Sequence, residues 1–180
     1  MRHKYYDQAL KTFMVGVHAA DPVLAVKRAL NGYDEKPTII SVGKAAVKMM
    51  SAANETLDDF VEAIAVTNSE NFQKIEGVKV FISGHPIPNE NGITAGQVVM
   101  KAVKDASKVR RPILCLISGG GSALLPAPRD GISLKEKIEL NSVLLASGAD
   151  IKTINLIRQK LSLLKGGGLL RYACLLYTSP

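Results

Sequence analysis

The sequence predicts an α/β fold in which helices cover both faces of a mainly parallel, doubly wound sheet. Short apolar runs alternate with longer segments of helical periodicity, as at residues 38–43 followed by 44–57. This alternation is typical of parallel strands joined by crossover helices. Glycine-rich turns also follow the strands, at the edge where open α/β sheets bind their ligands. We therefore expect a Rossmann-like arrangement.

Capping residues and apolar spacing place the elements along the chain. Apolar spacing predicts a helix over residues 5–18, and Asp21 followed by Pro22 supplies an N-cap and a first-turn proline for a second helix. Ser133 and Glu136 form a capping box that begins a later helix. The other expected elements are strands at 38–43, 62–67, 78–83 and 113–118 and helices at 44–57, 93–109, 133–147 and 151–161.

Length and composition predict one domain with a sizeable core. The chain has 180 residues and 47% apolar residues, and its apolar runs are too short to cross a membrane. The N-terminus lacks the pattern of a signal peptide. Cys115 and Cys174 form no CxxC pair, so we expect a reduced, cytoplasmic setting without a disulfide framework.

The basic balance of the chain favours a small anionic ligand over nucleic acid. The formal net charge is +7, but lysine and arginine are spread along the sequence. With four Phe, five Tyr and no Trp, no aromatic platform accompanies the basic residues. We therefore expect no nucleic acid or membrane partner.

The strongest chemical signal is the glycine loop, which we define as Ser118-Gly119-Gly120-Gly121-Ser122. An apolar strand ends directly before it. Glycine offers bare backbone N–H groups, and consecutive N–H groups at the carboxyl end of a strand form a concave anion site. We predict that Ser118, Gly119, Gly120, Gly121 and Ser122 bind phosphate. The alternative is an ordinary tight turn.

The glycine loop does not match three better-known glycine-rich motifs. A P-loop needs a lysine after its last glycine, and none follows Gly121 at the required place. Leu124 stands where the dinucleotide fingerprint needs its third glycine. The same residue replaces the final glycine of a hydrolase nucleophile elbow around Ser122.

Two further strand ends carry polar side chains. Lys44 follows Gly43 and is expected in the first turn of a helix, where its charge opposes the helix dipole unless an anion binds there. The alternative is a solvated lysine. His85, after the strand at 78–83, is a candidate for ligand binding or proton transfer, or for a hydrogen bond to a loop carbonyl.

Three polar residues near the C-terminal end complete the candidates. Asn155 and Arg158 lie three apart on one helix face, and Lys165 precedes three glycines. Arginine suits carboxylate or phosphate recognition, and asparagine suits hydroxyl groups. The alternatives are a plain polar helix face and a helix terminus. The histidines have no ligand-type neighbours at metal spacing, so we predict no metal site formed by the protein.

Several motifs in a fixed order resemble the ATP-dependent glycerate 2-kinase family, whose members are sometimes labelled hydroxypyruvate reductases. The similarity runs from about residue 5 to residue 173. It is carried by Asp21-Pro22, Ser41-Val42-Gly43-Lys44-Ala45, Gly84-His85-Pro86-Ile87-Pro88-Asn89, Ser118-Gly119-Gly120-Gly121-Ser122-Ala123-Leu124-Leu125, Ser147-Gly148-Ala149, Asn155-Leu156-Ile157-Arg158, Leu161-Ser162 and Lys165-Gly166-Gly167.

The resemblance implies transfer of the γ-phosphoryl group of ATP to the 2-hydroxyl of glycerate, giving 2-phosphoglycerate, with Mg²⁺ as cofactor. It implies that Lys44 is the active-site lysine and that the glycine loop binds nucleotide phosphate. Asn155, Arg158 and Lys165 match polar positions that line the family's cleft, and together with His85 they are the candidate substrate-binding residues. The alternatives are a non-catalytic nucleotide or sugar-phosphate binding module and an NAD(P)H-dependent hydroxypyruvate reductase. A homo-oligomer is compatible with the resemblance.

The resemblance also bears on domain organisation. Members of the family continue into a second domain, which contributes an active-site arginine. We therefore expect residues 1–173 to form a partial N-terminal domain that is inactive in isolation. Residues 174–180 depart from the family pattern and resemble sequencing read-through.

Overall fold

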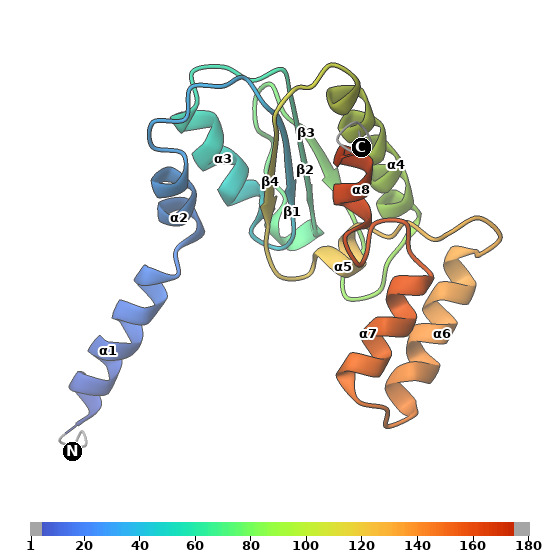
Figure 1. The fold of residues 1–180 in the computed structure, drawn as a ribbon. Helices are drawn as coiled ribbons and strands as arrows, with labels where there is room; N and C mark the ends of the chain where they lie inside the picture. The colour runs from blue at the N-terminus through green and yellow to red at the C-terminus, as the bar shows by residue number, and fades with distance from the viewer. Residues whose placement is uncertain (1–4, 175–180) are drawn as a thin grey trace.

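The computed structural model describes residues 5–174 and centres on a four-stranded parallel sheet. Its strands are β1 (Thr38–Val42), β2 (Glu62–Thr67), β3 (Lys79–Ile82) and β4 (Ile113–Ile117), in the order β3-β2-β1-β4 (Figure 1). All three neighbouring pairs are parallel. The predicted α/β class is confirmed, and this order begins the Rossmann arrangement.

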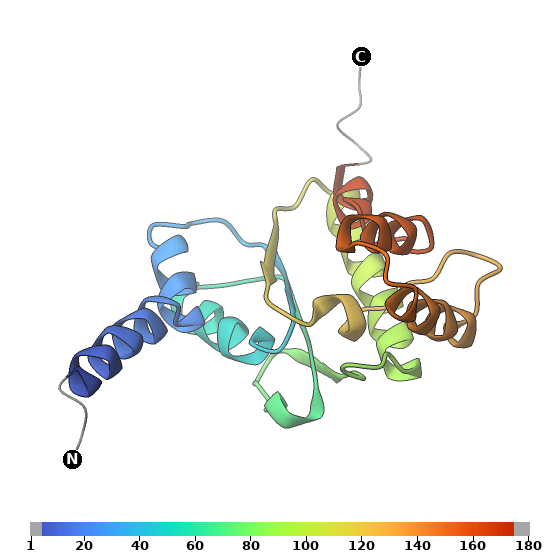
Figure 2. The same ribbon diagram turned by 90° about the horizontal axis from the view of Figure 1, so that it is seen from below.

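Helices cover both faces of the sheet, as Figure 2 shows from below. On one face, α2 (Pro22–Ala29) and α3 (Ala46–Thr56) pack on inward side chains such as Ile39 and Ala63. On the other face, α4 (Glu90–Lys108) and α8 (Gly168–Cys174) pack near Ile40 and Val66. Because both faces are covered, β1 is buried along its whole length and reads as a continuous apolar-rich run.

Three helices extend from this body. Helices α6 (Leu134–Ala146) and α7 (Ile151–Lys160) form a pair on the side where α5 (Gly121–Leu124) follows β4 (Figure 1). Helix α1 (Tyr6–Ala19) projects from the opposite side and buries none of its residues. No single described helix is long and apolar enough to cross a membrane, although the bent pair α1 and α2 passes that test together on length and composition.

Local capping explains where the helices begin. Asp21 Oδ1 accepts hydrogen bonds from the N–H groups at the start of α2, and Ser133 forms the expected capping box of α6. Helix α4 begins at Glu90, three residues before the expected start, because the side chain of Asn89 caps it. The short segments α5, α8 and a 3₁₀ turn at Ser69–Asn71 were not expected from the sequence. The predicted tail at 174–180 lies, beyond Cys174, outside the described residues.

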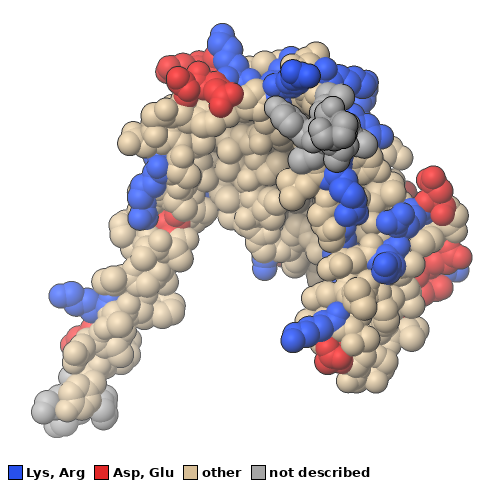
Figure 3. Space-filling view, in the orientation of Figure 1, with Lys and Arg blue, Asp and Glu red and all other residues tan. Residues whose placement is uncertain are grey.

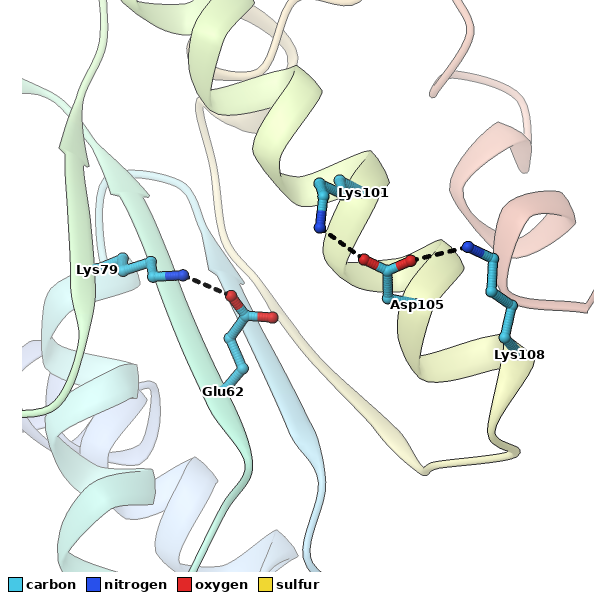
Figure 4. Close-up of polar contacts among 5 residues, drawn as sticks. All are labelled: Glu62, Lys79, Lys101, Asp105 and Lys108. Carbon is cyan, nitrogen blue, oxygen red and sulfur yellow. Dashed lines mark hydrogen bonds and ion pairs between the residues drawn. The ribbon is translucent and has the colours of Figure 1, made fainter.

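Charged side chains on the sheet edge and α4 pair locally. Lys79 on β3 bridges to Glu62 on β2, and Asp105 on α4 accepts from both Lys101 and Lys108 (Figure 4). These pairs are solvent-exposed and contribute little to stability. On the face seen in Figure 3, basic side chains lie in several groups over different elements, with acidic side chains beside some of them.

Candidate functional site

The loops after β1 and β4 are joined at the carboxyl edge of the sheet. The N–H of Lys44 donates to the carbonyl of Gly119 at 2.8 Å. The N–H of Ala45 donates to Ser118 Oγ at 3.0 Å. Adjacent parallel strands therefore bring Lys44 beside the glycine loop, and the Ser118 hydroxyl is used to hold the two loops together.

This close approach requires glycine at position 43. Its φ is +128°, and a Cβ built there would stand 2.7 Å from the Ser118 carbonyl oxygen. Backbone on the facing loop cannot move away without breaking the bonds that join the two loops. Gly43 is thus the residue that allows the loops to meet.

The glycine loop presents a run of free donors. Gly120 adopts a left-handed conformation with φ of +92°, and α5 begins directly after it. Among the described residues, none accepts a hydrogen bond from the backbone N–H groups of Gly119, Gly120, Gly121 or Ser122. Consecutive free N–H groups around a left-handed residue form a concave binding site for an anion.

Two side chains border this run of donors. A Cβ built on Gly120 would lie 3.1 Å from His85 Nε2 and 3.2 Å from Lys44 Cγ. The structure thus brings Lys44, His85 and the glycine loop together from three separate strand ends. The expected place of Lys44 in the first turn of α3 is wrong, because α3 begins at Ala46 and Lys44 belongs to the loop before it. The side chain is exposed, with no ion-pair partner among the described residues.

A second group of cations surrounds the hydroxyl of Ser122. Arg158 on α7 donates to Ser122 Oγ at 3.2 Å, and Lys165 Nζ also contacts this oxygen. Burial, with the charges of Arg158 and Lys137, lowers the pKa of Lys165 to about 8. Burial and Arg158 also lower the pKa of Lys137 on α6. Cations held this closely are stabilised by a bound anion.

Arg158 and Lys137 border a cleft of about 100 Å³ between α5, α6 and α7, whereas Lys165 is not among the residues that line it. Ser122, Lys137 and Arg158 line it, and Pro86 and Pro88 from the loop after His85 form another wall. Asn155 is exposed on α7 and does not line this cleft, so its role stays a prediction.

The sequence analysis did not identify Lys137. Its spacing of four residues from Asn141 and seven from Leu144, which is buried, was an available signal that it shares their helix face. Which residues that face meets is decided by the docking of α6 against the loops.

The described residues show no preformed group of metal ligands. No group of three or more His, Cys, Asp or Glu side chains within residues 5–174 could hold a metal ion. The lining of the cleft likewise includes no carboxylate. Protein sites for Mg²⁺ usually supply one or two carboxylates, so we assign no step to a metal held by these residues.

The lowered pKa of Lys165 predicts a pH dependence of stability. In the unfolded chain this lysine has its ordinary pKa of 10.5, so between about pH 8 and pH 10.5 the unfolded state binds more protons at this position. The free energy of unfolding at this position therefore rises with pH across that window. Between pH 7.5 and pH 10, the melting temperature of Lys165→Met should rise less, or fall more, than that of the unchanged chain. Identical pH profiles would contradict the lowered pKa.

Comparison with known proteins identifies the relatives of this chain. It is 36% identical over 162 residues to a D-glycerate 2-kinase of Thermotoga maritima, with 88% of this chain and 39% of that protein covered. It is 35% identical over 166 residues to a glycerate 2-kinase of Pyrococcus horikoshii, with 85% and 37% covered. The chain thus spans about two fifths of the length of the curated relatives it matches.

Structural comparison agrees with the sequence relationship. A crystal structure of a glycerate kinase from Thermotoga maritima superimposes with a TM-score of 0.85 at 34% identity, covering 92% of this chain and 40% of that one. The resemblance to glycerate 2-kinases noted in the sequence is thereby confirmed. A family model described as a domain of unknown function, DUF4147, matches residues 8–176. The chain belongs to the DUF4147 family, and its relatives include glycerate 2-kinases.

Proposed function

We propose that this chain is the nucleotide-binding part of a glycerate 2-kinase, which transfers the γ-phosphoryl group of ATP to the 2-hydroxyl of glycerate. The observation that carries the proposal is the run of four backbone N–H groups at Gly119–Ser122, beside Lys44, which have no acceptor within residues 5–174. The relatives named glycerate kinase support it. The absence of the dinucleotide fingerprint speaks against a reductase that uses NAD(P)H.

The geometry suits the needs of phosphoryl transfer. Negative charge spreads over the transferred group in the transition state, so catalysis depends on positioning and on charge stabilisation. In the proposal, the N–H groups of the glycine loop bind the phosphates, and the ammonium of Lys44 lies against the transferred group. The fixed loops cost no reorganisation during the reaction, because the bonds to Gly119 and Ser118 already hold them.

His85 is proposed to contact the acceptor hydroxyl. Its imidazole borders Gly120 on the same side as Lys44, and a neutral imidazole nitrogen can accept a proton. The acceptor oxygen forms a bond to the γ-phosphorus as the bond to the β,γ-bridging oxygen breaks, and the hydroxyl proton passes to His85 or to water. ADP and 2-phosphoglycerate are then the products.

Turnover and product identity test this proposal. The 180-residue chain, and a version extended to the length of its curated relatives, are incubated with ATP, Mg²⁺ and D-glycerate. We expect the extended protein to release ADP, and phosphorus NMR to identify 2-phosphoglycerate. ATP binding without ADP release in either protein would instead favour a binding module. Consumption of NADH with hydroxypyruvate would favour the reductase.

A matched pair of glycine substitutions tests the phosphate-binding role of the glycine loop. A Cβ on Gly119 meets nothing within 4 Å and its φ is not left-handed, whereas Gly120 has a φ of +92°. Gly119→Ala should therefore keep the melting temperature of the chain and weaken ATP binding, since the methyl group obstructs close approach of phosphate. Gly120→Ala should lose about 1 kcal/mol or more of stability. Unchanged ATP affinity in folded Gly119→Ala, measured by calorimetry, would remove this loop from the site.

A further inference from the structure

Strand β4 has one backbone edge that pairs with no other strand among residues 5–174. The strand order β3-β2-β1-β4 places it at the end of the sheet, where it pairs with β1 alone (Figure 1). No residue of β4 is charged, and none is proline. Natural sheets usually protect an edge with a charge, a proline, a bulge or a covering segment. The opposite edge strand, β3, does carry a charge, at Lys79.

Alternate residues of β4 direct their backbone groups to this open edge. Directly after the strand, the N–H of Ser118 donates to the carbonyl of Val42 on β1. In a parallel ladder every second residue of a strand bonds to a given neighbour, so the even-numbered residues of β4 bond to β1. The N–H and C=O groups of Ile113, Cys115 and Ile117 therefore point outward, and none of them has a hydrogen-bond partner within the described part of the chain.

The sequence of β4 is the same in both directions, so the strand is complementary to a second copy of itself. It runs Ile-Leu-Cys-Leu-Ile, with Cys115 at its centre. In an antiparallel pair centred on Cys115, Ile113 of one copy lies opposite Ile117 of the other. Directly opposed residues of this kind exchange both backbone bonds, so every outward N–H meets an outward carbonyl. A slip of one residue would instead oppose the outward groups to residues already bonded to β1.

We propose that two copies of this chain pair through β4 in this antiparallel register, which joins their sheets across a two-fold axis at Cys115. The side chain of Ile117, which is 67% exposed, then lies beside Ile113 of the second copy. Because each copy has one such edge, the pairing closes at a dimer. The contact runs along only five residues of each strand, so we expect a weak dimer. The proposal is independent of the proposed kinase function.

Analytical ultracentrifugation measures the predicted dimer. The chain is studied from micromolar to millimolar concentration in physiological salt, which screens the repulsion between two chains of net charge +7. We expect the mass to rise with concentration from one chain to two and no further. Ile117→Lys places a charge at the paired edge and should weaken dimerisation about tenfold or more. Ile151→Lys is the matched control, because Ile151 is 62% exposed on α7, and it should leave the dimer unchanged.

Thiol cross-linking tests the register. Cys174, the other cysteine of the chain, is replaced by serine so that only Cys115 reacts. Opposed residues that exchange both bonds have Cα atoms about 5.5 Å apart, so a short bifunctional thiol reagent such as dibromobimane can join the two Cys115 side chains. Burial raises the pKa of the Cys115 thiol, so the reaction is run at mildly alkaline pH. We expect a covalent dimer whose yield rises with protein concentration and falls about tenfold in Ile117→Lys.

Each contrary outcome places the contact elsewhere. A chain that stays monomeric at millimolar concentration would overturn the proposal, and protection of Cys115 from a monofunctional maleimide in that monomer would show that the chain covers its own edge. A dimer that Ile117→Lys leaves intact, or one in which Cys115 does not cross-link, would overturn it too. Melting temperatures confirm that each variant folds, and Ile117→Glu replaces Ile117→Lys if the latter does not.

Discussion

Replacing Lys44 by alanine should lower the kcat of the extended protein about 10²–10³-fold and raise KM for ATP far less. The Lys44 side chain passes the glycine loop, with its Cγ 3.2 Å from a Cβ built on Gly120. It has no carboxylate partner among the described residues, so its charge is free to act on the phosphates. Its contribution grows as negative charge develops on the transferred group, and an interaction that strengthens in the transition state appears in kcat. Steady-state rates of ADP release at varied ATP concentration measure both parameters.

Lys48 provides the control for this prediction. It lies exposed on α3, one turn beyond Lys44, and belongs to the same stretch of chain. Lys48→Ala should leave kcat and KM unchanged, and Lys44→Arg should recover part of the lost rate because it keeps the charge. A near-normal kcat for Lys44→Ala would show that this lysine is only solvated.

Replacing Gly43 by alanine should destabilise the fold by roughly 2–6 kcal/mol, the combined cost of overpacking and backbone strain. The added Cβ would stand 2.7 Å from the carbonyl oxygen of Ser118, and the φ of +128° is unfavourable for any side chain. Relief would require the loops after β1 and β4 to separate, which breaks the bonds from Lys44 and Ala45. Chemical denaturation followed by circular dichroism measures the loss.

Gly16 is the matched control for this substitution. It lies in α1, has no positive φ, and a Cβ there meets nothing within 4 Å. Gly16→Ala should be neutral or slightly stabilising, because alanine favours the helix. Equal stability of the two variants would contradict the close approach of the loops at Gly43.

The sequence was sufficient for those parts of the fold that depend on local patterns. Asp21 and Ser133 cap their helices as expected, because a cap is formed by neighbours in sequence. Asp150 caps α7 in the same local way. The start of α4 was missed because Asn91-Gly92 and the preceding prolines read as a loop. Helix α8 has no local signal, and it is held by tertiary contacts, with Ser107 Oγ donating to the carbonyl of Ala173 and Lys104 lying over the Tyr172 ring.

In the candidate site, too, some features follow from the sequence and others depend on tertiary packing. Parallel pairing carries every strand end to one edge, so the nearness of Lys44, His85 and the glycine loop followed from the order of elements. The cleft could not be predicted from the sequence, because its lining depends on the angle at which α6 and α7 meet α5. That angle is set by packing between segments far apart in sequence, so Lys137 had no sequence signal strong enough to place it. The experiments described above test whether the predicted site residues act as proposed.

The edge strand β4 has a consequence for how the chain behaves in solution. It pairs with β1 on one side only, and among the described residues no strand pairs with its other edge. Its sequence Ile-Leu-Cys-Leu-Ile holds neither charge nor proline, and the side chain of Ile117 is 67% exposed. A bare, apolar edge of this kind is a template for another copy of the same strand. The isolated chain should therefore self-associate through β4 as its concentration rises.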